Sequence, residues 1–392
     1  MIYKYPFSAI GHRLEDEIFD ILKEANKNMA TYTQGFFQEK FEKDFSERYN
    51  LPNTLAVSNA ASGLDLIAND LELSPDDEII CPAHTYCASA YPFLKTGASI
   101  IWCDIDKFTW LPSREDYLSK ITKNTKAIIV VHLYGAPSDI YEIYDELRSK
   151  NIKIIEDCAQ AIGAKYNDKY VGYYSDYAVF SFQSHKNIST LGEGGMLSIK
   201  DDSSYEKIKL QRHNGHTKYS IHKQKYWKPA MSDVRKVYED SLPSNFCMNE
   251  FQAIVGSYLL NKVDEIIDKR KMNWKIAEDL LKKYNKISMQ KIPLNSYSSF
   301  HLLPLRIDLS IDLIDYIFNA MSDSGIQCAK QYQPLYRYHL FNQNSENLEN
   351  EKLLVNTDSF YDQMISLPFH EDLSSTDLTF ILKTLINIVI NI

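Results

Sequence analysis

Short apolar segments alternate with amphipathic segments between residues 55 and 156, and this alternation constrains the fold more than any other feature. The expected strands span residues 55–57, 78–81, 99–104, 127–131 and 152–156. Helices are expected between them, at residues 64–71, 86–96, 114–120 and 140–150. Strands that are apolar throughout and separated by helices indicate a parallel sheet covered by helices on both faces. The sequence therefore predicts an α/β fold with three αβα layers.

The size and charge of the chain favour an enzyme that acts on small molecules. A chain of 392 residues is expected to form two or three domains. The net charge of −9 offers no basic surface for nucleic acid or for an acidic membrane. No window approaches eighteen apolar residues, and the first ten residues lack a signal-peptide core, so we expect a cytoplasmic protein with no membrane segment. The six cysteines form no CxxC pair, which predicts reduced core thiols and no metal site.

Ligands of parallel sheets bind at the carboxyl ends of the strands, where residues 58–63 and 157–160 are expected to lie. The turn at 58–63 could hold a phosphate at a helix N-terminus, or it could be an ordinary strand-to-helix turn. Asp157 ends an apolar strand and has two interpretations. As a helix N-cap it would contribute about 1 kcal/mol. As the partner of a protonated pyridine nitrogen, it would gain about 4 kcal/mol from two unit charges at ~4 Å and an effective dielectric of about 20.

Residues 180–199 predict a strand, a loop that contains Lys186, and a second strand after a glycine-rich turn. A lysine held between two strands and removed from bulk water favours the neutral amine, which can form a Schiff base with an aldehyde cofactor. Ser181, at the end of the first strand, could then hold a phosphate. The alternative is a surface lysine beside an ordinary glycine turn.

Three regions are predicted along the rest of the chain. Helices at 14–29 and 36–49 would form an N-terminal helix and loop (1–35) and the start of a large domain (36–255). A long loop is expected at 212–242 and a long helix at 249–268. A smaller C-terminal α/β domain (256–392) would contain a strand at 301–307 and helices at 311–324 and 376–388.

Several motifs, in order along the chain, carry a family resemblance. They are Ile155-Glu156-Asp157-Cys158-Ala159-Gln160-Ala161, Phe180-Ser181-Phe182 with Lys186, and Gly192-Glu193-Gly194-Gly195, supported by residues 131–135 and 366–369. From about residue 34 to residue 369, the chain resembles the DegT/DnrJ/EryC1/StrS family of pyridoxal-phosphate sugar aminotransferases. The resemblance implies the fold-type I architecture of aspartate aminotransferase, with pyridoxal 5'-phosphate as the cofactor.

The resemblance also implies roles for individual residues. Lys186 would form the Schiff base with the cofactor, and Asp157 would pair with the pyridine nitrogen. The remaining cofactor contacts would be those of Tyr86 and Gln160 with the ring, and those of Ala60, Ala61, Ser181 and Asn245 with the phosphate. Because the matching asparagine of relatives reaches the neighbouring subunit's phosphate site, a homodimer with shared active sites is expected.

The chain departs from the family pattern at a few positions. Ala61 stands where many relatives have threonine, and Cys247 where many have arginine, which would weaken phosphate binding without removing the bond-making groups. The aromatic insert at 226–231 and the segment Gln331-Tyr332-Gln333-Pro334 lie where relatives vary with substrate. These departures leave the identity of the sugar open.

Three functions are compatible with these residues. The first is transfer of an amino group from an amino acid, glutamate by resemblance, to a keto-sugar, with nucleotide-linked 4-keto-6-deoxyhexoses as the commonest family substrates and surface glycans as the expected destination. The second is a keto-sugar 3-dehydratase that uses pyridoxamine phosphate, but such relatives have histidine where this chain has Lys186. The third is a cofactor-binding protein without activity, against which Lys186 and Asp157 argue.

Overall fold

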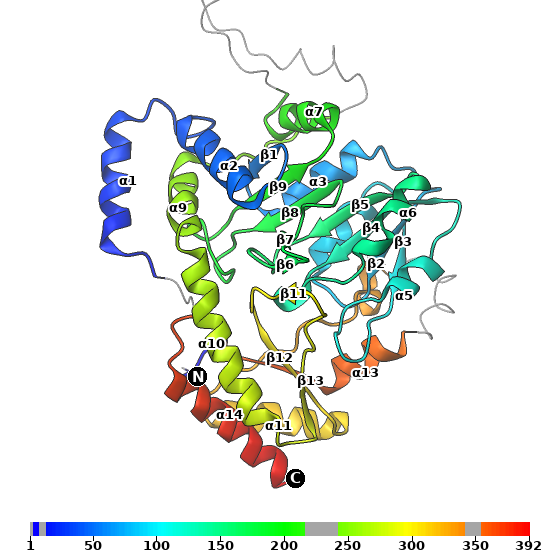
Figure 1. The fold of residues 1–392 in the computed structure, drawn as a ribbon, viewed down its shortest axis with the longest axis vertical. Helices are drawn as coiled ribbons and strands as arrows, with labels where there is room; N and C mark the ends of the chain where they lie inside the picture. Colours follow the sequence, from blue (N-terminus) through cyan, green and yellow to red (C-terminus); the bar gives the residue numbers. More distant parts are fainter. Residues whose placement is uncertain (1–2, 8–12, 216–241, 342–353) are drawn as a thin grey trace, which may run out of the picture.

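A seven-stranded sheet lies at the centre of the computed structural model, which describes residues 3–7, 13–215, 242–341 and 354–392 (Figure 1). The strands lie in the order β1-β9-β8-β5-β4-β2-β3. Their bounds are Thr54–Val57 (β1), Glu78–Pro82 (β2), Ser99–Cys103 (β3), Thr125–Val131 (β4), Lys153–Asp157 (β5), Tyr177–Ser181 (β8) and Gly195–Ile199 (β9). The insert predicted at 226–231, and most of the loop predicted at 212–242, lie outside the described residues.

The sheet is mainly parallel, as predicted. Strands β3, β2, β4, β5 and β8 pair in parallel, whereas β9 is antiparallel to both of its neighbours, β1 and β8. Val131 pairs with Asp157, and Asp157 pairs with Val179. The carboxyl ends of β4, β5 and β8 therefore lie together at one edge of the sheet, where a ligand of an α/β fold is expected.

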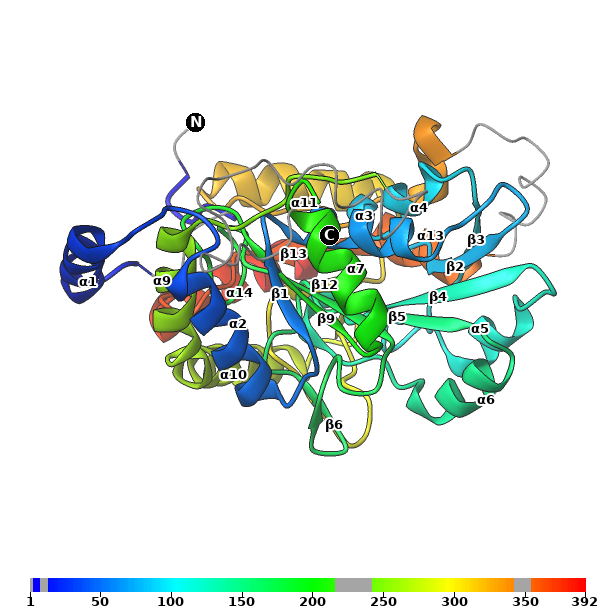
Figure 2. The ribbon, with the colours of Figure 1, turned by 90° about the horizontal axis from the view of Figure 1, so that it is seen from above.

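Helices cover both faces of this sheet (Figure 2). Successive side chains of β8 alternate between the faces, with Ala178 and Phe180 in one core cluster and Tyr177 and Val179 in another. The face of Phe180 is covered by α2 (Phe36–Tyr49), α5 (Arg114–Ser119), α6 (Tyr144–Ser149) and α9 (Glu250–Leu260). The face of Val179 is covered by α3 (Ala60–Asp70), α4 (Tyr91–Leu94) and α7 (Asp202–Arg212). The three-layer αβα fold class is confirmed.

A second, three-stranded sheet in the order β10-β12-β13 forms a smaller α/β unit toward the C-terminus. Its strands are Ile287–Met289 (β10), Leu303–Ile307 (β12) and Met364–Leu367 (β13), and its helices are Val263–Leu281 (α10), Ile311–Asp323 (α11), Val355–Gln363 (α13) and Ser375–Ile390 (α14). Helix α14 packs against α10 and α11 (Figure 1). The predicted boundary at residue 255 lies within α9, and the division into three regions stays a prediction.

Two small elements complete the described fold. A three-stranded ribbon joins β6 (Lys165–Tyr166), β7 (Lys169–Tyr170) and β11 (Ser296–Tyr297). Helix α1 (Asp16–Asn28) packs against α9 at the edge of the molecule (Figures 1 and 2). Within the ranges that the structure describes, none of the helices combines the length and the apolar character that crossing a membrane requires.

Several predicted helices differ from those observed. The helix predicted at 249–268 is two helices, α9 and α10, because the chain turns at residues 261–262. The helix predicted at 86–96 is a short 3₁₀ turn, Cys87–Ser89 (η1), followed by α4. Pro92 stands at the start of α4 and cannot donate the backbone hydrogen bond that a continuous helix would need there. The helix predicted at 140–150 likewise begins as a 3₁₀ turn, Tyr141–Ile143 (η3), before α6.

Candidate active site

A cavity of about 570 Å³ lies at the carboxyl ends of β4, β5 and β8. It is lined by all of the predicted cofactor residues except one, namely Ala60, Ala61, Tyr86, Asp157, Gln160, Ser181 and Lys186. The exception, Asn245, is exposed and pairs its backbone with that of His213. The structure thus brings seven of the eight residues to one cavity, and the role of each stays a prediction.

Lys186 lies in the loop between β8 and β9, which is closed by backbone hydrogen bonds. Phe182 N donates to Gly194 O at 2.8 Å, and Ser184 N donates to Gly192 O at 2.9 Å. A Cβ on Gly195 would lie 2.8 Å from Ala60 N, so glycine is required where the end of this loop touches the start of α3. The predicted strand, loop and strand are observed, and Lys186 of this loop lines the same cavity as Ala60 at the start of α3.

Lys186 is half-buried, and no described residue accepts a hydrogen bond from its Nζ. Burial lowers the pKa of Lys186 to about 8, although the Asp157 and Glu193 carboxylates raise it in part. A large fraction of neutral amine near pH 8 is the property that a lysine nucleophile needs. Lys186 lines the cavity, and its role as the nucleophile stays a prediction.

Asp157 is 6% exposed and holds its carboxylate through two hydrogen bonds. The Ser89 hydroxyl donates to Oδ2 at 2.7 Å, and Ala159 N donates to Oδ1 at 3.0 Å. Residues 158–164 form turns, so no helix begins here and the helix-cap interpretation of Asp157 does not apply. Each carboxylate oxygen keeps a lone pair that can accept a further hydrogen bond.

Ser89 is a site residue that the sequence analysis missed. It belongs to η1, and its hydroxyl lies 3.0 Å from that of Thr85, so two alcohols and the Asp157 carboxylate form a chain. The spacing of Thr85 and Ser89 could have indicated Ser89, because it places two hydroxyl groups one helical turn apart just after β2.

The start of α3 forms one wall of the cavity. The Asn59 side chain caps the helix by accepting from Ser62 N at 2.8 Å, and Ala60 and Ala61 occupy the first turn. The helix begins four residues earlier than predicted because of this cap. Backbone N–H groups at a helix start favour a phosphate, and the nearby Ser181 hydroxyl can donate as well.

Gln160 connects the large sheet to the segment 331–334, which by resemblance lies where relatives vary with substrate. Its Oε1 accepts from Tyr134 N at 2.7 Å, and its Nε2 donates to the Tyr332 hydroxyl at 2.8 Å. The ring of Tyr332 lies edge-on to that of Tyr86, with centroids 5.7 Å apart. Tyr86 is 56% exposed, so its ring is available to stack on a ligand.

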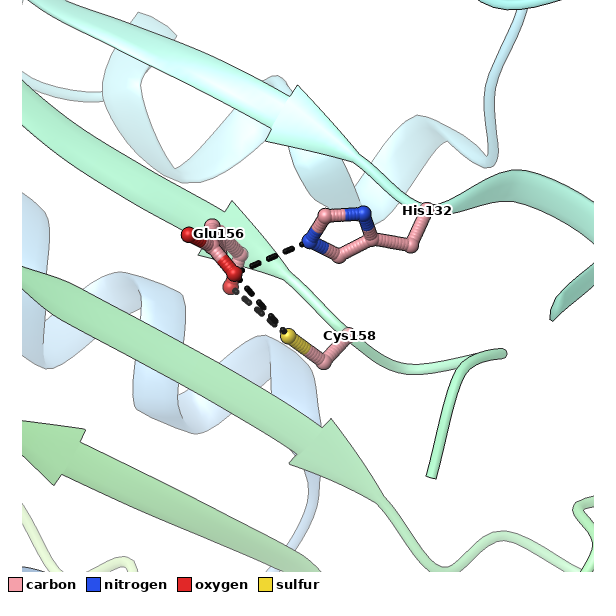
Figure 3. A group of neighbouring side chains, drawn as sticks. All are labelled: His132, Glu156 and Cys158. Carbon is pink, nitrogen blue, oxygen red and sulfur yellow. Dashed lines mark hydrogen bonds and ion pairs between the residues drawn. The ribbon is translucent and has the colours of Figure 1, made fainter. Parts of the chain in front are cut away.

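A buried network of His132, Glu156 and Cys158 lies next to Asp157 in the sequence (Figure 3). Ser138 N donates to His132 Nδ1 at 3.0 Å, so His132 Nε2 carries the hydrogen that reaches Glu156 Oε2 at 3.0 Å. Burial raises the pKa of the Cys158 thiol well above its ordinary value, so the thiol stays protonated. Since a metal would require a thiolate and would have to displace the His132–Glu156 bond, we interpret the group as a structural hydrogen-bond network.

The two departures from the family pattern lie in different surroundings. Ala61 lines the cavity and offers no hydroxyl. Cys247 does not line it, and its sulfur accepts from Gln34 Nε2 at 3.0 Å. The cavity nevertheless offers an amine, a carboxylate and the N-terminus of a helix, which are groups that could hold pyridoxal phosphate.

Comparison with known proteins decides the family. Residues 12–386 match the DegT/DnrJ/EryC1/StrS aminotransferase family. The chain belongs to this family. The GDP-perosamine synthase of Escherichia coli O157:H7 is 36% identical over 269 residues, which cover 69% of this chain and 68% of that protein. The GDP-perosamine synthase of Caulobacter vibrioides is 29% identical over 332 residues, which cover 84% of this chain and 85% of that protein.

Solved structures of other aminotransferases share the fold. The Helicobacter pylori aminotransferase involved in pseudoaminic acid biosynthesis has a TM-score of 0.87 and 24% identity, with both chains covered completely. A putative sugar aminotransferase from Streptococcus pneumoniae, solved in its PMP form, has a TM-score of 0.88 and 24% identity, covering 98% of this chain and 99% of that one. The predicted fold-type I architecture and the predicted aminotransferase family are therefore confirmed.

Proposed function

We propose that this aminotransferase uses pyridoxal phosphate to move an amino group from an amino acid, glutamate by resemblance, to a nucleotide-linked 4-keto-6-deoxyhexose. The observation that carries the proposal is the amine of Lys186, with its lowered pKa, in the same cavity as the Asp157 carboxylate. Two relatives named GDP-perosamine synthase support a nucleotide-linked sugar as the acceptor. The product would be an amino sugar for a surface glycan, made in the cytoplasm.

Different residues of the cavity would bind different parts of the cofactor. Pyridoxal phosphate, when bound, supplies an aldehyde that captures amines and a ring that accepts electrons from a deprotonated carbon. The start of α3 and Ser181 would hold the phosphate, and Asp157 would accept the N–H of the pyridine ring. Tyr86 and Gln160 would contact the two sides of the ring.

Lys186 would move the proton in both halves of the reaction. Its amine takes a proton from the α-carbon of the amino-acid donor and later returns a proton to the sugar carbon that receives nitrogen. A pKa of about 8 suits both steps, because the amine can accept a proton and release it near neutral pH. Ser89 keeps the Asp157 carboxylate oriented throughout, through the 2.7 Å hydrogen bond.

The proposal includes a homodimer with shared sites. Asn245 is exposed and lies outside the cavity of its own chain, which is compatible with a contact to the partner subunit's phosphate site. Helices α1, α2 and α9 border an apolar groove beside Phe36, whose side chain is 70% exposed. A second copy of the chain would cover this surface.

The test is a pair of half-reactions with the purified enzyme. Glutamate should convert the bound cofactor from its aldehyde to its amine form, and a nucleotide-linked keto-sugar should convert it back, both followed by absorbance. Lys186→Ala should abolish both conversions without unfolding the protein, and Lys282→Ala, on the exposed surface beyond α10, is the matched control. Borohydride reduction should attach the cofactor to Lys186 in a peptide map; attachment to another lysine would refute the assignment.

A further inference from the structure

His301 is a buried histidine in the wall of the same cavity, and none of the steps above uses it. It precedes β12, is 4% exposed, and lines the cavity together with Lys186. Its backbone is held on both sides, since His301 N donates to Tyr134 O at 3.0 Å and Arg270 Nη1 donates to His301 O at 2.8 Å. The ring therefore has a fixed position between the large sheet and the smaller unit.

The hydrogen bonds of Asn187 determine which ring nitrogen of His301 carries the hydrogen. Asn187 Nδ2 donates to Ser299 O at 2.8 Å, so Asn187 Oδ1 is the atom that lies 3.0 Å from His301 Nδ1. An amide oxygen accepts only, so Nδ1 must carry the hydrogen and donate it. The opposite amide orientation would place two oxygens against each other at Ser299.

The second ring nitrogen, Nε2, has no hydrogen-bond partner among the described residues. Burial first, and then the charges of Lys186, Arg270 and His185, hold the pKa of His301 well below its ordinary value. The ring is therefore neutral at physiological pH, with a hydrogen on Nδ1 and a lone pair on Nε2. Because His301 lines the cavity, a bound ligand or water there can donate a hydrogen bond to this lone pair.

We propose that His301 Nε2 accepts a hydrogen bond from a hydroxyl group of the bound sugar, and that this contact helps the cavity to distinguish the sugar from the amino-acid donor. The inference rests on the proposed function, because it assigns one part of the sugar site. Hydroxyl groups are donors that a neutral imidazole nitrogen can accept. The carboxylates of an amino acid accept only, so they gain nothing from Nε2.

Two substitutions of His301 separate its two nitrogens. In His301→Asn the amide nitrogen can replace Nδ1 and keep the bond to Asn187, but the acceptor at Nε2 is lost. In His301→Gln the longer side chain can place its oxygen near the position of Nε2. We expect His301→Asn to slow the sugar half-reaction about tenfold more than the glutamate half-reaction, as measured by kcat/KM, and His301→Gln to restore part of the difference. His370→Asn, which alters a half-buried histidine outside the cavity, is the control.

A second measurement does not depend on turnover. Nitrogen NMR of the holoenzyme labelled with ¹⁵N-histidine, with His301→Asn used to assign the signal, should show a neutral ring protonated at Nδ1. A ring protonated at Nε2 or at both nitrogens would overturn the inference, as would equal losses in both half-reactions.

The sugar half-reaction is measured in the reverse direction, with GDP-perosamine as the amino-sugar substrate and with UDP- and dTDP-linked amino sugars for comparison. If the wild-type enzyme converts neither glutamate nor any of these sugars, the proposed function fails, while the NMR result still decides the state of His301.

Discussion

At the scale of single residues, the main chemical feature of the cavity is the amine of Lys186, whose charged form is disfavoured. Lys186 is half-buried in the loop between β8 and β9, and the nearby carboxylates offset only part of the effect of burial on its pKa. The sequence already indicated this lysine and Asp157, because both follow directly from motifs at predicted strand ends. Neither Ser89 nor His301 could be predicted in the same way, because their roles depend on contacts with residues far away in the sequence.

The lowered pKa of Lys186 predicts how the enzyme without cofactor captures pyridoxal phosphate. The neutral amine is the reacting form, and its fraction increases as pH rises through the pKa. The rate of covalent capture, followed by absorbance, should therefore increase with a midpoint near pH 8. A midpoint near 10.5, the ordinary value for lysine, would mean that the pKa of Lys186 is not lowered in solution. Lys282→Ala should leave the profile unchanged.

Ser89 predicts a measurable contribution to cofactor binding. Ser89→Ala removes the hydroxyl that donates to Asp157 Oδ2 at 2.7 Å, so the carboxylate is held less firmly toward the ring nitrogen. Hydrogen bonds to charged groups contribute about 1.5–3 kcal/mol, so we expect the Kd for pyridoxal phosphate to increase roughly 10- to 100-fold, with a lower kcat. Ser89→Thr keeps a hydroxyl and should retain most of the affinity. Equal affinity of Ser89→Ala and wild type would exclude the role.

At the scale of elements, periodicity predicted the strands well and the helices less well. The strands of the large sheet were placed to within a few residues because their apolar side chains are buried on both faces. The broken helices were missed for local reasons. Pro92 interrupts one of them, and Asn261 ends α9, with its side-chain amide donating to Ser257 O at 3.1 Å. A hydrophobic pattern continues through such turns, so spacing alone cannot detect them.

The network around Glu156 links the ends of β4 and β5 and predicts a stability effect. Glu156 accepts hydrogen bonds from the His132 ring, from the Tyr144 hydroxyl at 3.0 Å and from Gly172 N. Glu156→Gln replaces one acceptor oxygen with a donor, which leaves at least one of these buried donors unpaired. We expect a loss of about 1–3 kcal/mol in the free energy of unfolding, measured by urea denaturation.

The matched control for this change is Glu142→Gln in η3, at an exposed carboxylate that pairs with Arg114. Surface changes of this kind alter stability by less than about 0.5 kcal/mol. If Glu156→Gln were as stable as the control, the network would not hold the strand ends. Because Asp157 directly follows Glu156, a destabilised Glu156→Gln should also bind pyridoxal phosphate more weakly.

At the scale of the whole molecule, the fold brings residues from both α/β units to one cavity. Asp157 ends a strand of the large sheet and Lys186 lies in a loop between two of its strands, whereas His301 and Tyr332 belong to the C-terminal part of the chain. The resemblance of the motifs predicted the order of the elements and the overall architecture. It could not predict which side chains of the smaller unit reach the cavity, because this depends on how the two units pack.

One predicted cofactor residue, Asn245, does not reach the cavity of its own chain. If its amide donates to the phosphate in the partner subunit, it contributes a hydrogen bond without adding charge. Ala61 supplies no hydroxyl there, so the site should depend strongly on Asn245 and on backbone N–H groups. Asn245→Ala should therefore lose affinity for pyridoxal phosphate and show little activity when the cofactor is scarce.

Mixing two inactive variants tests whether the site is shared. In a dimer of one Asn245→Ala chain and one Lys186→Ala chain, one site lacks both residues, whereas the other site takes Lys186 and Asn245 from different chains and is intact. Subunit exchange between the purified variants should therefore restore activity at low cofactor concentration. Because one of the two sites in each mixed dimer is intact, a mixed dimer should reach up to about half of the wild-type activity. Each variant incubated alone under the same exchange conditions is the control. If the mixture stays inactive although mass spectrometry shows that mixed dimers have formed, Asn245 does not belong to the partner subunit's site.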